Sequence, residues 1–497
     1  MDRKYDVVII GSGLGGLACG YILSKNGYKV AVLEKNRQFG GCLQNFVRKG
    51  AKFETGMHYI GSVSPGQTLN QFFKYLSLLD ALTFSELDKN GFDIISIGGN
   101  RYVYASGYDN FAEKMIEKFP HDAADIRQYV AAIRKVADSS PMYSLSNLDQ
   151  IALLSPEWVK TSVNDFVATV VRNPLLQDVL VGTLPLYAGV RDKTPAFIHA
   201  LICNFYINGA NRIVGGSDAI ALSLVKSIRS FGGEAFSSAK SVKINCCNGK
   251  ASSVVLENGT VVETDYIISN VHPENTLQMI DSPLIRQVYR DRISHLEQTV
   301  SNFTVYLRFK ENTVPYLNAN FYHYSGDVWG CEQYTGDDWP RNYLYMHMCP
   351  SASATYAGAG EIIAYMRYED VARWTGTKVG NRGKDYEDFK QQHAEKLIDS
   401  LEEQFPGTKK GIDACYTSSP LTYIDYTGTK EGSMYGVIRD KNAPKSTVIA
   451  QRTKIPNLFF TGQNINSHGI LGVIIGSILT CSEILGYQYL MKQVLRA

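Results

Sequence analysis

Three glycines near the start of the chain, Gly11, Gly13 and Gly16, have the spacing G-x-G-x-x-G. In dinucleotide sites the first glycine makes a tight turn, the second lets the backbone approach a pyrophosphate, and the third lets a helix pack on a strand. Glu34 follows about twenty residues later, where a carboxylate can accept hydrogen bonds from an adenosine ribose. These residue types at this spacing predict a dinucleotide-binding site.

The elements that must position these residues are also visible. Residues 6–10 form a continuous apolar run, which is typical of a buried parallel strand. Residues 17–26 indicate a helix, and residues 28–33 indicate a second strand that ends at Glu34. This order is a βαβ unit, so a dinucleotide site is favoured over a glycine turn without a ligand. The acidic Glu34 disfavours a 2′-phosphate, so FAD or NAD fits better than NADP.

Arg37 comes next, three residues before the pair Gly40 and Gly41. Paired glycines let the backbone pass close to a cofactor, and an arginine can offer fixed positive charge to a diphosphate or to the edge of a flavin. The alternative is an ordinary surface turn.

His58 and Tyr59 stand between Gly56 and Gly61 and are the most notable titratable side chains of the first segment. A lone histidine is more often a structural residue than a catalyst, and we keep both interpretations of His58 open.

The composition excludes several classes of function. The chain has 497 residues with 50 basic and 48 acidic side chains, so its net charge of +2 gives no sign of nucleic-acid binding. Its nine cysteines are scattered without a C-x-x-C pair, which favours free thiols in a reducing cytoplasm and no metal site. No apolar run is long enough to span a bilayer.

The chain divides into five segments. Residues 65–211 are mainly helical, and the stretches 163–181 and 194–207 are apolar around most of their circumference. Such helices form buried core, line a tunnel for a lipid, or lie at a membrane interface. We therefore predict a cytoplasmic protein that can rest on the inner face of a membrane.

The remaining segments alternate between two patterns. A helix over 218–230 and a hairpin turning at Asn258-Gly259 belong to residues 212–275, whereas residues 276–454 show the alternation of an antiparallel sheet. Near the end, a strand runs into Gly462 and a helix opens at Gly469. We assign dinucleotide binding to 1–64, 212–275 and 455–497, and substrate binding to 65–211 and 276–454.

Taken together with Gly215-Gly216 and Asn270, these motifs resemble the FAD-dependent amine-oxidase-like flavoproteins, in the branch of phytoene desaturase, carotenoid isomerase and retinol saturase. Residues 457–464 and 469–477 are similar to the terminal flavin-binding segment of carotenoid desaturases, and residues 53–61 are similar to all-trans-retinol 13,14-reductases. The chain departs from these patterns at Cys42-Leu43, where retinol reductases have two cysteines, and at Leu471, where desaturases have proline.

The resemblance implies an α/β fold, with a Rossmann-like FAD-binding domain and an α+β substrate domain inserted in two segments. FAD would place its diphosphate over the first glycines, its ribose on Glu34, its adenine against the backbone of Val242, and its flavin near the last helix. The implied cofactor contacts are Gly11, Gly13, Leu14, Gly15, Gly16, Glu34, Lys35, Arg37, Gly40, Gly41, Val242, Asn270, Gly462, Gln463, Gly472 and Val473.

The predicted reaction is reduction, desaturation or isomerisation at C=C bonds of a polyene, isoprenoid or related lipid, in an apolar and dry site. For reduction, the proton donor would be His58, Tyr59 or Tyr423. Two alternatives are a flavin amine oxidase and a non-catalytic binder of prenylated partners on the same fold. The sequence does not identify the electron donor or acceptor.

Overall fold

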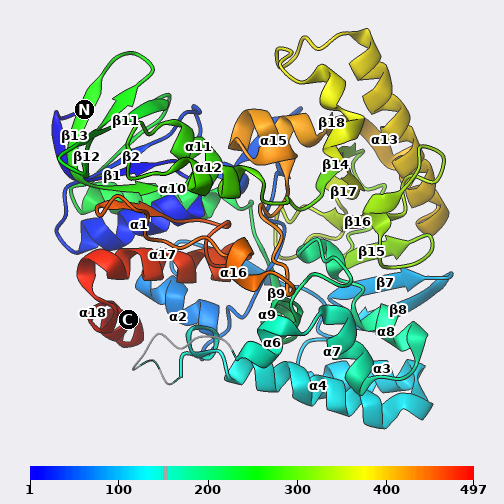
Figure 1. The fold of residues 1–497 in the computed structure, drawn as a ribbon. Coiled ribbons are helices and arrows are strands. Elements are labelled where there is room, and N and C mark those ends of the chain that lie inside the picture. Colours follow the sequence, from blue (N-terminus) through cyan, green and yellow to red (C-terminus); the bar gives the residue numbers. More distant parts are fainter. Residues whose placement is uncertain (147, 149–154) are drawn as a thin grey trace.

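The structure is a computed structural model that describes residues 1–146, 148 and 155–497. Among these residues, two seven-stranded sheets lie in different halves of the molecule, seen at the upper left and at the right of Figure 1. Two small sheets complete the strands: β3 (Asn45–Arg48), β4 (Ala51–Glu54), β5 (Ile60–Gly61), β6 (Phe84–Glu86) and β9 (Ala210–Ile213).

The first sheet carries the predicted βαβ unit. In spatial order its strands are β10 (Glu234–Phe236), β2 (Val30–Leu33), β1 (Lys4–Ile10), β13 (Val261–Ser269), β12 (Lys250–Leu256) and β11 (Ser241–Cys247). The seventh strand, β19 (Leu458–Phe460), pairs in parallel with the last residues of β13. Strands β10, β2, β1 and β13 also run parallel, and their central residues are buried on both faces. This burial explains their continuous apolar runs.

All seven strands of this sheet come from the segments 1–64, 212–275 and 455–497. The helices α1 (Leu14–Lys25), α10 (Asp218–Ser230) and α17 (Gly469–Leu485) belong to the same three segments, and α1 packs against both other helices. Helix α1 starts three residues earlier than the sequence suggested, directly after Gly13. The last glycine of the motif, Gly16, therefore lies in the first turn of the helix, and Gly13 is its N-cap.

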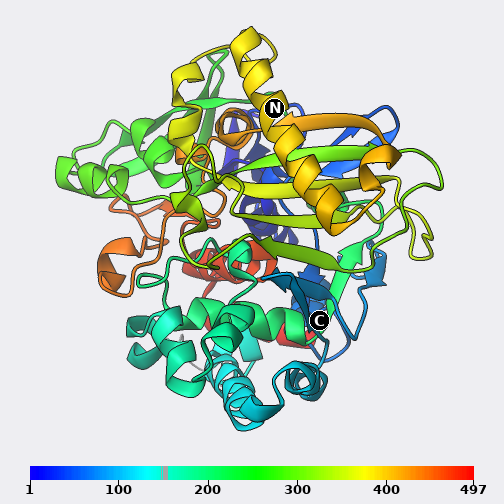
Figure 2. The same ribbon diagram turned by 90° about the vertical axis from the view of Figure 1, so that its right-hand side faces the viewer.

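The second sheet holds the alternating aromatic strands. Its order is β18 (Ile412–Ser418), β14 (Ser301–Phe309), β17 (Ala359–Met366), β16 (Asn342–His347), β15 (Asn320–Tyr324), β7 (Asp93–Ile97) and β8 (Asn100–Tyr104). In Figure 2, helix α13 (Lys384–Gln404) lies across this sheet, and its Tyr386, Leu397 and Leu401 are buried in the same apolar cluster as strand residues. The predicted antiparallel pattern holds except between β15 and β7, which run parallel.

Residues 65–211 are mainly helical, as predicted, but β7 and β8 also come from this segment. Each is only five residues long, and β7 finds its partner β15 far along the chain. Their stability depends on that remote pairing, so the local pattern was weak.

The apolar stretches of this segment are interior helices. Residues 163–181 form two helices, α7 (Val163–Val170) and α8 (Pro174–Leu180), because Pro174 starts a new helix. Helix α9 (Ala196–Ile207) is buried along most of its length. Between residues 163 and 207, Leu175 is the sole large apolar side chain that is exposed, and membrane contact stays a prediction.

The other helices are shorter or lie at the periphery. They are α2 (Thr68–Tyr75), α3 (Tyr108–Lys118), α4 (Ala123–Asp138), α5 (Pro141–Ser144), α6 (Pro156–Lys160), α11 (Pro273–Gln278), α12 (Gln287–Ser294), α14 (Thr408–Gly411), α15 (Pro420–Thr427), α16 (Pro444–Thr447) and α18 (Tyr487–Arg496). Within the described ranges, no helix combines the length and the hydropathy that crossing a bilayer requires.

One asparagine joins the last segment to the first sheet. The Asn457 side chain accepts a hydrogen bond from Ala251 N at 2.9 Å and donates to Ala251 O at 2.8 Å and to Asp265 O at 2.6 Å. Asn457→Ala leaves these backbone groups without partners, and each such loss costs about 1–3 kcal/mol when buried. We expect a loss of at least about 2 kcal/mol in the free energy of unfolding, measured by urea denaturation. The exposed Asn381→Ala is the control, and equal stability of both variants would contradict the expectation.

Candidate functional site

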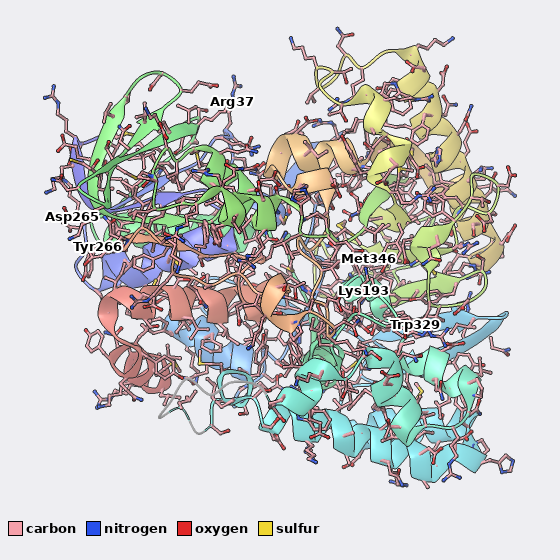
Figure 3. The ribbon with its side chains drawn as sticks, in the orientation of Figure 1. Arg37, Lys193, Asp265, Tyr266, Trp329 and Met346 are labelled. Atoms are coloured by element: carbon pink, nitrogen blue, oxygen red, sulfur yellow. The ribbon has the colours of Figure 1, made fainter. Side chains whose placement is uncertain are left out.

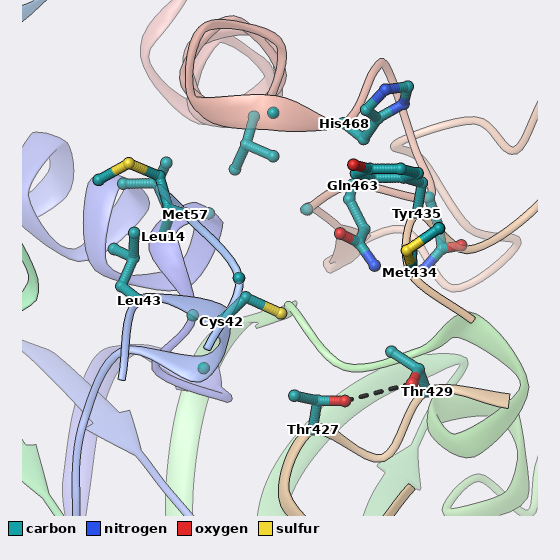
Figure 4. Close-up of a pocket in the computed structure, with 18 of the residues that line it drawn as sticks. Leu14, Cys42, Leu43, Met57, Thr427, Thr429, Met434, Tyr435, Gln463 and His468 are labelled. Atoms are coloured by element: carbon teal, nitrogen blue, oxygen red, sulfur yellow. Dashed lines mark hydrogen bonds between the residues drawn. The ribbon is translucent and has the colours of Figure 1, made fainter. Parts of the chain in front are cut away.

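A cavity of about 550 Å³ lies between the two sheets and takes its walls from all five segments. In Figure 4, Leu14, Cys42, Leu43 and Met57 line one side, and Gln463, Tyr435 and His468 line the opposite side. Thirteen predicted cofactor contacts line it: Gly11, Gly13, Leu14, Gly15, Glu34, Lys35, Gly40, Gly41, Asn270, Gly462, Gln463, Gly472 and Val473. The predicted proton donors His58, Tyr59 and Tyr423 line the same cavity.

The backbone at the glycine-rich end is packed too closely for side chains. A Cβ atom on Gly13 would lie 2.7 Å from Asn270 Nδ2, and one on Gly15 would lie 2.5 Å from Asn270 Oδ1. A Cβ on Gly462 would lie 2.6 Å from the same oxygen, and one on Gly16 would lie 2.1 Å from Gly11 O. Glycine at these positions lets the three backbone segments meet and leaves their N–H groups accessible to a ligand.

Fixed positive charge surrounds this end of the cavity. Helices α1 and α17 both begin at the cavity wall, at Leu14 and Gly469, and helix N-termini carry unpaired N–H groups and a partial positive charge. The Lys35 side chain also lines the wall and donates to Asp425 O at 2.9 Å. An anionic diphosphate is therefore favoured here.

The Glu34 carboxylate is held in place at the end of β2. Its Oε2 accepts hydrogen bonds from Ser12 N at 3.0 Å and Ser12 Oγ at 2.6 Å, and its Oε1 accepts from Asn36 N at 2.8 Å. A carboxylate has about four acceptor positions, so Glu34 can still accept a hydrogen bond from a ribose hydroxyl.

Three predicted contacts lie outside the cavity wall. Gly16 faces the turn at Gly11 instead, as its packing role requires. Arg37 is exposed and lies at the periphery in Figure 3, so the surface-turn alternative describes it better. Val242 is 41% exposed, and the wall at β11 is formed by Ala239, Lys240 and Ser241. The predicted contacts of Arg37 and Val242 with the cofactor stay predictions.

The other end of the cavity is apolar. Helix α9 contributes one long wall, made of Phe197, Ile198, Leu201, Ile202, Phe205 and Tyr206. Leu344, Ile363 and Tyr365 from the second sheet face it. Of the alternatives for this apolar stretch, lining a tunnel therefore fits the position of α9. The apolar end of the cavity suits a hydrophobic ligand.

His58 stands over a buried carboxyl pair. Its Nδ1 lies 3.3 Å from Glu361 Oε2 and 3.9 Å from Glu54 Oε2. Burial, together with the nearby positive charge of Arg212, lowers the pKa of His58 to about 3. His58 is therefore a neutral imidazole at physiological pH.

The hydroxyl groups of Tyr59 and Tyr423 make different numbers of hydrogen bonds. The Tyr59 hydroxyl donates to Asp93 Oδ2 at 3.0 Å and lies 2.7 Å from the Tyr322 hydroxyl. The Tyr423 hydroxyl donates to Thr55 O at 2.8 Å. Burial raises the pKa of both phenols, which keeps them protonated.

Sequence reasoning missed several polar residues of the site. Tyr435 and His468 stack with ring centroids 4.5 Å apart on the cavity wall, and Asn302 lies near Tyr423. Glu361 and Arg212 are buried under His58. For Tyr435, the aromatic and glycine-rich stretch around it was the signal in the sequence. Glu361 lies inside a strand, and no local motif marks it as a site residue.

These observations fit a bound dinucleotide. Close glycine packing, two helix N-termini and a held carboxylate are the features that a diphosphate and a ribose require. Residues 9–76 match the family model described as an NAD(P)-binding Rossmann-like domain.

Comparisons with known proteins extend over the whole chain. Human all-trans-retinol 13,14-reductase is 30% identical, over 98% of this chain and 86% of that protein. Chloroplastic prolycopene isomerase from Daucus carota is 23% identical, over 97% of this chain and 80% of that protein. The solved structure of putrescine oxidase with putrescine is 14% identical, with a TM-score of 0.63 over 97% of this chain and 99% of that one.

The fold is the one seen in putrescine oxidase, and it contains a Rossmann-like dinucleotide-binding domain. The similarity to putrescine oxidase concerns the fold alone. The chain belongs to the family of the all-trans-retinol 13,14-reductases. The family membership confirms the predicted resemblance and favours an enzyme on C=C bonds over the two alternatives.

The surroundings of Tyr59 predict a pH effect. Burial raises the pKa of the Asp93 carboxyl to about 7, although hydrogen bonds from Asn320 and Tyr59 oppose this shift. An unfolded aspartate has a pKa of about 3.9, so the stability present below about pH 4 is lost as the pH rises to about 7. Asp93→Asn avoids that loss, and its unfolding free energy relative to wild type should rise by about 1–3 kcal/mol from pH 5 to pH 8.

Urea denaturation of wild type and Asp93→Asn at both pH values measures this change. Exposed Asp281→Asn is the matched control, and its difference from wild type should be the same at both pH values. A pH-independent difference for Asp93→Asn would show that the buried carboxyl is ionised throughout.

Proposed function

We propose that this protein is an FAD-dependent oxidoreductase that reduces a C=C bond of a polyene, isoprenoid or related lipid. The observation that carries the proposal is one continuous cavity. Its glycine-rich end suits the dinucleotide, its apolar end suits a hydrophobic chain, and His58 lies on its wall. The names of two relatives, retinol reductase and prolycopene isomerase, both refer to polyenes.

FAD is favoured over NAD as the bound dinucleotide because of the resemblance to flavoproteins and the second helix N-terminus from α17. When bound, a flavin supplies hydride transfer to or from carbon. The residues of the chain supply the rest. Glycines and Asn270 hold the backbone around the diphosphate, and side chains of α9 exclude water from the reacting carbons.

Reduction also needs a proton at the carbon next to the one that receives hydride. His58, Tyr59 and Tyr423 are protonatable side chains on the wall, and none carries charge at neutral pH. A neutral donor suits an apolar site, because a buried charge would be costly there. This supply of protons favours reduction over desaturation.

The cofactor is tested first. The purified protein should carry non-covalent FAD, and Gly13→Val should lose the yellow colour, because even its Cβ would clash with Asn270. Flavin absorbance per chain measures the loss, and circular dichroism checks folding. Gly326→Val is the control, because open space surrounds that position. A colourless wild-type protein that FAD cannot reconstitute would defeat the proposal.

The proton donor is tested by reoxidation. His58→Ala, Tyr59→Phe and Tyr423→Phe should still bind FAD and accept electrons from a chemical reductant. At least one should slow the reoxidation of the reduced flavin by an unsaturated lipid, by about two to four powers of ten. Stopped-flow absorbance measures the rate, with exposed Tyr356→Phe as the control.

If all three variants reoxidise at the wild-type rate, the proposed donors are wrong. If a saturated lipid instead reduces the oxidised wild-type flavin, the proposed direction is wrong.

A further inference from the structure

The acid behind His58 has no assigned role. Glu361 lies on β17 and its side chain is fully buried, whereas the His58 ring forms part of the cavity wall. The atoms His58 Nδ1 and Glu361 Oε2 are 3.3 Å apart, and neither makes a hydrogen bond to any of the described residues. This distance is slightly long for a hydrogen bond, and such contacts often tighten when substrate binds.

The second oxygen of Glu361 is already engaged. Glu361 Oε1 accepts a hydrogen bond from Glu54 N at 2.9 Å, and Glu54 Oε1 accepts from Ser217 N at 2.9 Å. The carboxyl group is thereby oriented with Oε2 toward His58. The geometry leaves room for one hydrogen between Oε2 and Nδ1.

The buried charges indicate where this hydrogen resides. Arg212 is the cation that acts on this pair, and it is 2% exposed with Nη2 donating to Ala319 O at 3.0 Å. Two carboxylates beside one guanidinium would leave an uncompensated buried charge, which is costly. Burial and the nearby Glu54 raise the pKa of Glu361 well above its usual range, and burial raises that of Glu54 to about 7. Glu361 is thus the protonated member at neutral pH.

We propose that Glu361 is a positioning residue that stores a proton for His58. Its O–H group donates to Nδ1, so the single hydrogen of the neutral imidazole must sit on Nε2. The two ring nitrogens point in different directions, and Nε2 is the one left to face the cavity. Glu361 thereby selects the tautomer of His58 that can donate to a ligand.

The same contact completes a proton transfer, and this part of the inference depends on the proposed reduction. If the reaction is reduction of a C=C bond, the carbon next to the one that receives hydride must also receive a proton. That carbon takes the proton of Nε2 and forms a C–H bond, while Nδ1 takes the proton of Glu361. The imidazole stays neutral throughout, whereas the new Glu361 carboxylate adds a second negative charge beside Arg212, which favours its return to the protonated form. A proton taken from water at Nε2, with the Nδ1 proton returned to Glu361, restores the starting state before the following turnover.

The proton on Glu361 is tested without any substrate. Infrared spectra of the purified FAD-containing protein at neutral pH should contain the carbonyl band of a protonated, buried carboxyl group. Glu361→Gln should remove that band, and Glu263→Gln, at an exposed strand position, should leave it. Equal spectra of wild type and Glu361→Gln would show an ionised Glu361 and overturn the proposal.

The tautomer is tested by ¹⁵N NMR of histidine-labelled protein, with His58→Ala to assign the signals. Wild type should show an unprotonated Nδ1 and a protonated Nε2. Glu361→Gln should keep this pattern, because its amide also donates to Nδ1. Glu361→Leu should give mixed tautomers. A protonated Nδ1 in wild type would overturn the proposal, even if Glu361→Leu fails to fold.

The rate at which an unsaturated lipid reoxidises the reduced flavin distinguishes the two roles of Glu361, which are to store a proton and to select the tautomer of His58. Glu361→Gln keeps the tautomer but cannot give up its proton, so reoxidation should slow by about 10²-fold or more. An unchanged rate with an unchanged tautomer would refute the storage role. If no unsaturated lipid reoxidises wild type, the proposed reduction fails instead, and the infrared and NMR results still decide whether Glu361 holds His58.

Discussion

The structure depends on how closely three chain segments approach one another around the amide of Asn270. This amide fills the space in which Gly13, Gly15 and Gly462 would otherwise carry side chains. Asn270 N also donates to Ile10 O at 2.8 Å, which extends the pairing of β1 with β13 up to the site. The glycines are therefore required by the packing of the protein itself as well as by a ligand. The two helix N-termini and the cavity follow from this contact.

Local signals explain what the sequence could predict. The unit β1-α1-β2 was visible because its apolar runs, its glycines and Glu34 follow one another directly. Helices α10 and α17 were found for the same reason. Strands β7 and β8 were missed because they are short and the partner of β7, β15, lies in another segment. Pairing between distant residues leaves no trace in a local pattern.

The distinction between local signals and contacts of distant residues also applies to the site. His58 was found because glycines flank it, and Asn270 because of the family resemblance. Arg37 was placed by its position before the pair Gly40 and Gly41, and it is exposed. Val242 was placed by the family resemblance, and it lies one residue beyond the wall. Glu361 was invisible, since an acid within a strand normally indicates a face turned to water. Only the packing of β17 against β4 places it beneath His58.

The last segment has a consequence for how the protein matures. Strand β19 pairs with β13 inside the first sheet, and Ser477 of α17 donates to Gly15 O at 3.2 Å. During translation the first glycine turn emerges long before these residues do. The wall of the cavity is therefore complete only after nearly the whole polypeptide has left the ribosome. Until then, the apolar face of α1 that α17 covers is open to chaperones, and a prematurely terminated chain presents the same face to proteases.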